Sequence, residues 1–357
     1  MNQRPLLTFI VSCYNHETFI REAVEGALAQ TYSPLEIVVA DDCSTDRSFD
    51  VIRDCVAAYR GPHTVRVNRN ETNLGIGGNV NRAMELSHGE LIVIAAGDDV
   101  SLPARTEKLC EAWVQSGRRA TSICSSYTTI SEDGTPQGLG GLRGDPRDTR
   151  PVIRLEADLG SFLETRGPTA PGCTHAWSPE LFKYFGPLKS GLEDLVLSFR
   201  SMAIGQILYL REPLVKYRRH GRNVSFFAGG DDCTSFAHRE ERLRWVDEQS
   251  ANAYANMLAD VEVLHRNGRL TAAERDRLRN LGGRIRMFYV AEQQMMDRSF
   301  LKRMKTLAGA AGRGDLRCAL RLSPRLLPRA LYRSLYLLKN RNKAAKTITS
   351  GSARNGN

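Results

Sequence analysis

The sequence predicts an α/β fold with a mostly parallel central sheet, followed by a C-terminal helical extension. The first observation is a series of short apolar runs of strand length, separated by stretches whose apolar residues have helical spacing. The second is that polar or acidic residues follow several of these runs. Strands that alternate with helices of this length form βαβ units, and ligands bind at the carboxyl ends of such strands.

The first half of the chain supplies most of the predicted sheet. Apolar runs predict strands over residues 6–11, 35–40, 64–67, 91–96 and 121–127. We expect helices between them over about 17–30, 46–59 and 79–87, and a further helix that opens at Pro103. Residues 131–150 contain seven Gly and Pro between 134 and 146, which predicts a surface loop.

The second half predicts shorter elements and then long helices. We expect helices over 179–185 and from Gly191 onward, strands over 206–210 and 213–217, and a loop over 226–232. Residues 234–300 have a helical pattern, which breaks at Gly268 and restarts at a capping box, Thr271 to Glu274. This pattern predicts three parts: a sheet domain over 1–228, a helical extension over 229–300, and a partly disordered basic tail over 301–357.

The basic character of the chain belongs to its tail. The net charge is +10, but residues 301–357 contain 14 Lys and Arg against one acid, so residues 1–300 carry −3. Arg recurs every four residues from 313 to 333 among Leu and Tyr, which favours contact with an anionic membrane surface. A solvated basic helix or a disordered arm is the alternative. The acidic balance of residues 1–300 argues against nucleic-acid binding.

Targeting signals are not visible in the sequence. No apolar run approaches the roughly 20 residues of a membrane-spanning helix, and the N-terminal run is too short for a signal peptide. The eight cysteines form no C-x-x-C pair, so we expect reduced thiols and a cytoplasmic protein, with no zinc site. The helical region 234–300 has two open interpretations, packing on the sheet domain or forming a homodimer.

Two adjacent carboxylates, Asp98 and Asp99, follow the apolar strand at 91–96. Neighbouring carboxylates repel in a dry site unless a cation joins them, and Mg²⁺ or Mn²⁺ bound by carboxylates usually also holds substrate phosphates. This pattern indicates a metal and diphosphate site. A solvated turn that caps the next helix is the alternative.

A second acidic pair, Asp41 and Asp42, follows the strand at 35–40. Consecutive strands are usually neighbours, so both pairs should open onto one crevice, where one pair can bond a nucleotide base or ribose. Neither the G-x-G-x-x-G fingerprint nor the P-loop pattern occurs, which disfavours a dehydrogenase and a P-loop enzyme. The glycines of residues 75–78 are a weak signal for phosphate contact.

Several motifs then occur in a fixed order. They are Thr8-Phe9-Ile10-Val11-Ser12-Cys13-Tyr14-Asn15, Ala29-Gln30-Thr31-Tyr32, the run from Glu36 to Asp46, Asn73-Leu74-Gly75, His88-Gly89-Glu90-Leu91-Ile92, Gly97-Asp98-Asp99, Glu193-Asp194 and Tyr217-Arg218-Arg219-His220. Together they resemble a bacterial family 2 glycosyltransferase of the O-antigen or capsule type, over residues 6 to about 225. The resemblance implies the GT-A fold of nucleotide-diphospho-sugar transferases.

The resemblance also implies roles for individual residues. Ser12 and Asp42 match positions that contact the nucleotide, and Asn73 joins them as a donor-binding residue. Asp98 matches a position near the sugar and ribose. Asp99 matches a ligand of the divalent metal, Mn²⁺ or Mg²⁺, and His220 matches a position that often meets the metal or diphosphate.

The same resemblance makes Asp194 the general base. A helix start between Leu192 and Leu195 would bury this carboxyl and raise its pKa toward a useful value. The alternatives are an ordinary helix-start acid at Asp194 and a surface histidine at His220. We expect the acceptor site to be lined by three further residues, His175, Trp177 and Glu193, although core packing is an alternative for Trp177.

The sequence also departs from the family. Cys43 stands where the family commonly has Gly, which is unfavourable if the backbone there has φ > 0. The Gln-x-x-Arg-Trp element and the membrane helices of processive members are absent, which argues for one sugar added per encounter.

The sequence therefore predicts a metal-dependent, inverting glycosyltransferase. It would move one sugar from a nucleotide-sugar donor to a hydroxyl of a glycan or lipid-linked acceptor in bacterial surface polysaccharide synthesis. We expect a cytoplasmic protein, peripheral at the inner face of the membrane. A sugar nucleotidyltransferase and a nucleotide-binding scaffold without catalysis are the alternatives, although Ser12–His16 lacks the phosphate loop of a nucleotidyltransferase.

Overall fold

The computed structural model describes residues 4–142, 149–167, 170–189, 191–221, 223, 236–295 and 300–312. Its strands are β1 (Leu7–Cys13), β2 (Leu35–Asp41), β3 (Thr64–Arg69), β4 (Leu91–Ala96), β5 (Val100–Ser101), β6 (Ala120–Ile130), β7 (Pro136–Gly140), β8 (Val152–Leu155), β9 (His175–Trp177) and β10 (Gln206–Arg218). Its helices are α1 (Ile20–Leu28), α2 (Ser48–Ala58), α3 (Gly75–Glu85), α4 (Arg105–Gln115), α5 (Leu159–Thr165), the 3₁₀ turn η1 (Gly172–Thr174), α6 (Glu180–Phe185), α7 (Glu193–Ile204), α8 (Phe236–Arg266), α9 (Ala272–Met295) and α10 (Phe300–Gly312).

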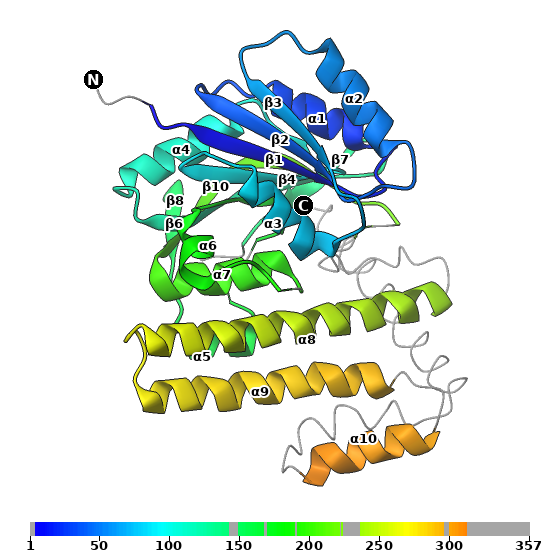
Figure 1. The fold of residues 1–357 in the computed structure, drawn as a ribbon, viewed down its shortest axis with the longest axis vertical. Coiled ribbons are helices and arrows are strands. Elements are labelled where there is room, and N and C mark those ends of the chain that lie inside the picture. The colour runs from blue at the N-terminus through cyan, green and yellow to red at the C-terminus, as the bar shows by residue number, and fades with distance from the viewer. Residues whose placement is uncertain are drawn as a thin grey trace, which may run out of the picture. The chain divides into compact units, whose positions relative to one another are not determined.

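The strands form one mixed sheet in the order β3-β2-β1-β4-β9-β6-β10-β5, with β7 beside β6 and β8 beside β10. The first four strands in this order are parallel, and β6 and β10 are parallel to each other. The short strand β9 joins the two parallel groups through antiparallel pairs with β4 and β6. Figure 1 shows the first group, in which β3, β2, β1 and β4 lie side by side. The predicted α/β sheet is therefore confirmed, and short antiparallel strands complete it.

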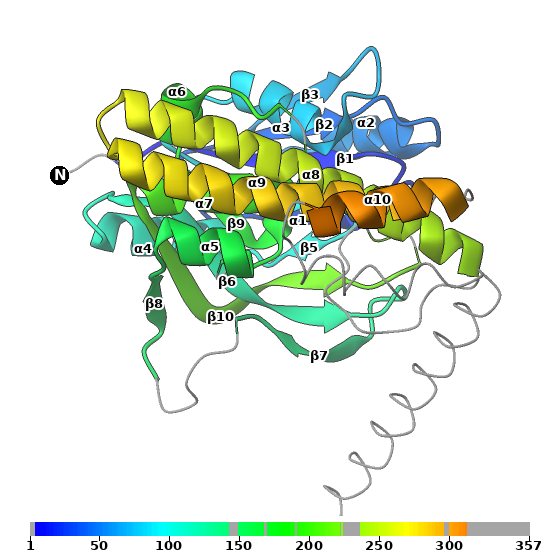
Figure 2. The same cartoon turned by 90° about the horizontal axis from the view of Figure 1, so that it is seen from below.

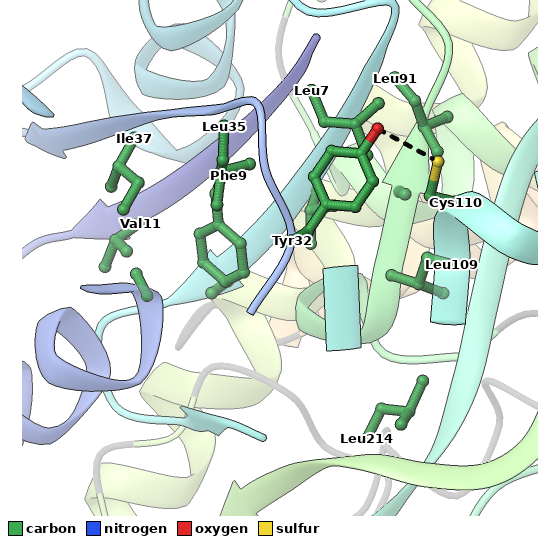
Figure 3. Close-up of a cluster of buried hydrophobic side chains, with 14 of the residues drawn as sticks. Leu7, Phe9, Val11, Tyr32, Leu35, Ile37, Leu91, Leu109, Cys110 and Leu214 are labelled. Atoms are coloured by element: carbon green, nitrogen blue, oxygen red, sulfur yellow. Dashed lines mark hydrogen bonds between the residues drawn. The ribbon is translucent and has the colours of Figure 1, made fainter. Parts of the chain in front are cut away.

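Helices cover both faces of the sheet. Alternate residues of β1, such as Leu7, Phe9 and Val11, point to the face that α1, α2 and α4 cover, and all three side chains are fully buried. Burial of each such side chain contributes about 1.5–3 kcal/mol. Figure 3 shows this core, including a Cys110 thiol that donates to the Tyr32 hydroxyl at 3.5 Å. Helix α3 packs on the other face against β1 and β2, near their carboxyl ends, and α7 packs on β6 and β10.

Three sequence predictions were wrong in detail. Residues 131–150 are not only loop, because β7 pairs with β6 (Figure 2). Tyr127 of β6 lies opposite Gly140 of β7, and its ring covers that glycine. The strands predicted at 206–210 and 213–217 are one strand, β10, with an irregularity around Pro213. Helix α3 begins at Gly75 and not at Asn79, so the glycines of residues 75–78 form its first turn.

The chain divides into two compact units, Met1–Asp232 with Asn252–Ile285, and Cys233–Ala251 with Arg286–Asn357. Within the first unit, the capping box before α9 is confirmed, since the Thr271 N–H and hydroxyl both donate to Glu274 Oε2. The domain boundary predicted at 228/229, the loop at 226–232 and the tail beyond residue 312 lie outside the described residues. Among the helices of the described ranges, none has the length and apolar character to cross a membrane.

Candidate functional site

The ends of β1 and β2 are joined through buried asparagines. The Asn79 amide, on α3, donates to Ser12 Oγ at 2.9 Å and to the Ala40 carbonyl at 3.0 Å. Asn70 Nδ2 donates to Asn79 Oδ1 and to Asp42 Oδ1, both at 2.9 Å. We call Ser12, Asp42, Asn70 and Asn79 the donor network, after the nucleotide-sugar donor that Ser12 and Asp42 are expected to contact. The structure brings together two residues predicted from the sequence and two asparagines that sequence reasoning missed, because no spacing rule distinguishes them from surface asparagines.

Asp42 is held with one oxygen in use. Its Oδ1 accepts from Asn70 and from the Leu74 N–H at 2.8 Å, and its side chain belongs to a residue only 3% exposed. Within the described residues no hydrogen bond uses Oδ2. The carboxylate is therefore fixed in place and retains one oxygen that can accept an N–H from a ligand.

Two other predicted residues on this side have local partners. Asp41 is fully buried and accepts from the Ser44 N–H at 3.0 Å and faces Arg69 Nε at 3.5 Å, so its carboxylate is occupied within the protein. Asn73 is exposed, and its Oδ1 accepts from the Gly75 N–H at 3.0 Å. Asn73 makes no hydrogen bond to Ser12 or Asp42 and is separate from the donor network.

Asp98 lies at the end of β4, beside two histidines. His220 Nε2 is 3.0 Å from Asp98 Oδ2, and His16 Nε2 is 3.9 Å from the same oxygen. Asn223 Nδ2 donates to it at 3.3 Å. Burial opposes ionisation of Asp98, but the bond from His220 and the charges of both histidines outweigh it and hold the pKa of Asp98 below its usual value. The structure thus brings the predicted residues Asp98 and His220 together.

Asp99 is in a different environment from its neighbour. It is 2% exposed, and its Oδ1 accepts from the Arg218 N–H at 2.8 Å. Burial, followed by the adjacent charge of Asp98, raises the pKa of Asp99 well above its usual value. The buried Cys173 thiol bonds Asp99 and opposes this shift only in part. The pKa values of the two adjacent carboxylates are therefore shifted in opposite directions, and Asp99 is the one that is more easily protonated.

Arg218 fixes the turn that carries both carboxylates. Besides the bond to Asp99, its Nε donates to the Asp98 carbonyl at 3.1 Å, and another guanidinium nitrogen donates to Glu22 at 2.9 Å. It is 1% exposed and stacks over Phe19 at 5.0 Å. The Tyr217–His220 motif thus supplies one residue that supports the acidic turn and one that touches Asp98.

A second acidic pair, Glu193 and Asp194, opens α7. Burial, followed by the charge of Asp194, raises the pKa of Glu193 to about 8. Burial also raises the pKa of Asp194, against the backbone N–H of Leu195, which donates to its Oδ1 at 2.7 Å. A raised pKa makes a carboxylate a better proton acceptor from a hydroxyl.

The short turn η1 connects the two acidic pairs. Cys173 in this turn bonds Asp99, and the preceding Gly172 packs against Glu193 and Asp194. A Cβ at Gly172 would lie 2.6 Å from Glu193 Oε1 and 3.4 Å from Asp194 Cβ. A side chain at residue 172 would therefore displace the Glu193 carboxylate, and the end of β4, η1 and the start of α7 converge near one edge of the sheet.

His175 and Trp177 belong to the core. They are 0% and 1% exposed, and their rings stack at 4.3 Å. The His175 nitrogens face Ser122 Oγ at 3.0 Å and the Ala170 carbonyl at 3.1 Å, and burial lowers the pKa of His175 to about 3. These positions favour core packing for both residues, because their rings and the His175 nitrogens contact other groups of the protein.

Known proteins resemble this chain over its sheet-bearing part. Residues 8–152 match the family described as Glycosyl transferase family 2. A putative glycosyltransferase of Bacillus subtilis, EpsE, is 32% identical over 108 residues, which cover 30% of this chain and 38% of EpsE. The putative teichuronic acid biosynthesis glycosyltransferase TuaG, also of Bacillus subtilis, is 28% identical over 135 residues, covering 38% of this chain and 52% of TuaG.

An uncharacterised glycosyltransferase of a Nostoc species matches a longer part, with 28% identity over 258 residues, 70% of this chain and 74% of that protein. The chain thus spans only two fifths to a half of EpsE and TuaG but most of the Nostoc protein. The matched segment carries the Asp42 and Asp98-Asp99 motifs on the predicted α/β sheet. Over residues 8–152 the chain is therefore similar to glycosyltransferase family 2, and the structure of this segment confirms the α/β fold that its motifs predicted.

Proposed function

We propose that this protein moves one sugar from a nucleotide-sugar to a hydroxyl of a glycan or lipid-linked acceptor, with inversion at the sugar carbon and with a divalent metal. The observation that carries the proposal is a single edge of the sheet with three kinds of carboxylate. Asp42 has one oxygen open to a ligand, Asp98 and Asp99 form a buried acidic pair, and Asp194 has a raised pKa. Binding, charge neutralisation and proton removal are the three tasks of such a transfer.

The donor nucleotide would bind at the donor network. Asp42 Oδ2 accepts an N–H from the edge of the base, whereas the acid at the end of the second strand in dinucleotide folds accepts from a ribose hydroxyl. Ser12, bonded to Asn79, contacts the nucleotide beside it. Asn79 and Asn70 would act as positioning residues that hold Ser12 and Asp42 for the nucleotide. Asn73 is exposed and lacks such support, so we place it at the rim of the donor site.

The acidic pair suits Mg²⁺ or Mn²⁺. In the described residues no group of three or more His, Cys, Asp or Glu is arranged to hold a metal. These ions nevertheless bind through one or two carboxylates together with substrate phosphates and water. Asp99 and Asp98 would hold the ion, with His220 beside them, and a cation there would oppose the effects of burial and of the Asp98 charge that raise the pKa of Asp99. When bound, the ion neutralises charge that develops on the leaving diphosphate.

Asp194 would act as the base. Its carboxylate takes the proton of the acceptor hydroxyl while the acceptor oxygen forms a bond to the sugar carbon, and the bond from that carbon to the diphosphate oxygen breaks. One displacement by one base inverts the configuration at that carbon. Glu193, whose pKa is about 8, is a neutral carboxyl at pH 7 and can donate a hydrogen bond to the acceptor.

The setting we propose is the synthesis of a bacterial surface polysaccharide. TuaG is named for teichuronic acid biosynthesis, and it is similar to this chain over 135 residues. The basic tail, with 14 Lys and Arg against one acid, would keep the enzyme at an anionic cytoplasmic membrane face near a lipid-linked acceptor.

The test measures the melting temperature of the wild type and of Asp99→Ala against UDP, GDP, ADP and dTDP, with and without Mn²⁺. A ligand at a hundred times its Kd stabilises the folded state by about 2.7 kcal/mol, which is roughly 5–10 °C for a domain of this size. We expect one nucleotide to give a Mn²⁺-dependent shift that Asp99→Ala loses. No shift with any nucleotide would overturn the donor site and favour a scaffold without catalysis.

A further inference from the structure

The segment that leads into the proposed base is held in an unusual way. Residues 186–189 together with 191 and 192, which we call the clamp loop, lie between the end of α6 and Glu193 at the start of α7. Gly186 and Gly191 have φ of 80° and 100°, so both need glycine. Because Asp194 follows the clamp loop directly, a shift of this loop moves the carboxylate.

Asn81, on α3, bonds both backbone groups of one residue in the clamp loop. Its Nδ2 donates to the Leu188 carbonyl at 2.7 Å, and its Oδ1 accepts from the Leu188 N–H at 2.9 Å. The Leu188 side chain is 4% exposed. This pair of bonds imitates the pairing of two strands and fixes both the position and the orientation of the peptide.

A second asparagine bonds the clamp loop from α8. Asn256 Oδ1 accepts from the Lys189 N–H at 2.9 Å, and its Nδ2 donates to the Asn252 carbonyl at 3.0 Å within its own helix. Asn256 is 3% exposed. Since its amide is oriented by the bond to Asn252, its oxygen points at the clamp loop in a fixed direction.

The helix that carries Asn256 is itself anchored to α7. Asp260 pairs with Arg200 through bonds of 2.8 and 3.1 Å, and both side chains are at most 3% exposed. Arg200 also donates to the Gly186 carbonyl, at 2.7 Å. Removal of one partner from a buried ion pair strongly destabilises a protein. The Arg200–Asp260 pair therefore holds α8 to α7, and Arg200 also holds the clamp loop.

We propose that Asn81 and Asn256 are positioning residues, which hold the clamp loop so that Asp194 meets the acceptor hydroxyl. The inference rests on the proposed function of Asp194. Side chains from three helices bond four backbone groups of the clamp loop: the Gly186 carbonyl, both groups of Leu188 and the Lys189 N–H. Loops usually leave such groups to water and move more freely. Residues 252–266 of α8 are then part of the catalytic apparatus and not an independent appendage.

The test compares Asn256→Ala with two matched variants. Asn256→Asp keeps an oxygen that accepts from the Lys189 N–H. Tyr254→Phe removes a different buried bond of the same helix, from the Tyr254 hydroxyl to the Leu163 carbonyl at 2.6 Å, and leaves the clamp loop intact. Hydrogen exchange of the Leu188 and Lys189 amides reads the clamp directly. Nucleoside diphosphate release from UDP- and GDP-sugars reads turnover, with donor KM measured beside it.

We expect Asn256→Ala to exchange the Lys189 amide at least tenfold faster and to lower kcat at least tenfold, with donor KM within twofold of wild type. Asn256→Asp, which keeps the acceptor for Lys189 but loses the bond to the Asn252 carbonyl, should restore both only in part, and Tyr254→Phe should change neither. Faster exchange without a fall in kcat would overturn the positioning role, and so would an unchanged Lys189 amide. If the wild type binds no nucleotide and releases no diphosphate, the proposed function fails, whereas the exchange result still decides the clamp.

Discussion

The donor network and the Glu193-Asp194 pair place carboxylates at the same edge of the sheet in opposite ways. Asp42 accepts from the Asn70 amide and from the Leu74 N–H, and Asn70 in turn donates to Asn79. Asp194 is bonded by the backbone N–H groups of Leu195 and Gly172, and burial outweighs these bonds and raises its pKa. An oxygen that must accept a ligand N–H benefits from a fixed orientation, whereas a carboxylate that must take a proton benefits from a raised pKa. Position and proton affinity are thus supplied by different surroundings.

The largest expected effect is on the base. Asp194→Asn keeps the shape of the side chain but cannot take a proton, so turnover should fall by roughly 10²–10⁴-fold. Nucleotide binding, measured by calorimetry with UDP or GDP and Mn²⁺, should stay within about twofold of wild type, as expected for a loss in the chemical step alone. The matched control is Glu193→Gln, which imitates the neutral carboxyl of Glu193. If Glu193→Gln loses much more turnover than Asp194→Asn, the roles assigned to the two acids are reversed.

The second effect is the pH dependence of stability through His175, which tests whether this residue belongs to the core or to the site. His175 has a pKa of about 3 in the folded protein against 6.5 when exposed, so it is neutral when buried. The unfolded chain therefore binds a proton that the folded protein does not, and stability present above pH 6.5 is lost as pH falls toward 3, by at most about 1.4 kcal/mol per pH unit.

Urea unfolding at pH 7.5 and pH 5 would check this slope. We expect wild type to lose up to about 2 kcal/mol between these values through His175, and His175→Gln, although less stable at pH 7.5, to lose correspondingly less. Equal losses in both proteins would mean that His175 is accessible to protons, and its place in the core would then be wrong.

The third effect tests the donor network. Asn79→Ala removes the bonds to Ser12 and Ala40 and leaves Asn70 with one partner fewer. Loss of buried bonds of this kind costs about 1–3 kcal/mol, so the melting temperature should fall by roughly 2–10 °C and nucleotide affinity should fall about tenfold. Asn73→Ala is the matched variant, since Asn73 is exposed and outside the network. Comparable losses of affinity in both would return Asn73 to the donor site.

The two regions also differ in how far the sequence could predict them. Buried parallel strands leave continuous apolar runs, so β1, β2 and β4 and the acids at their ends were predicted. Strands β5 and β9 have two and three residues, too few to show a period. Asn79 and Asn256 act through contacts across long stretches of chain, and a buried asparagine on a helix has no pattern of its own. We expected His175 to line the acceptor site, and only the fold reveals that its ring is buried.

The smallest expected effect concerns the departure from the family at Cys43. Its φ is 59°, so its backbone has the left-handed conformation that favours the glycine common in the family. The Cys43 thiol lies 3.5 Å from the Glu71 carbonyl. A side chain in this conformation costs about 1 kcal/mol, but glycine also has more freedom in the unfolded chain. Cys43→Gly should therefore change stability by less than about 1 kcal/mol, toward a higher melting temperature. Because Cys43 adjoins Asp42, nucleotide affinity measured in the same samples would separate relief of strain from loosening of the donor network. A lower melting temperature together with weaker nucleotide binding would mean that the thiol's contact with Glu71 holds Asp42 in place.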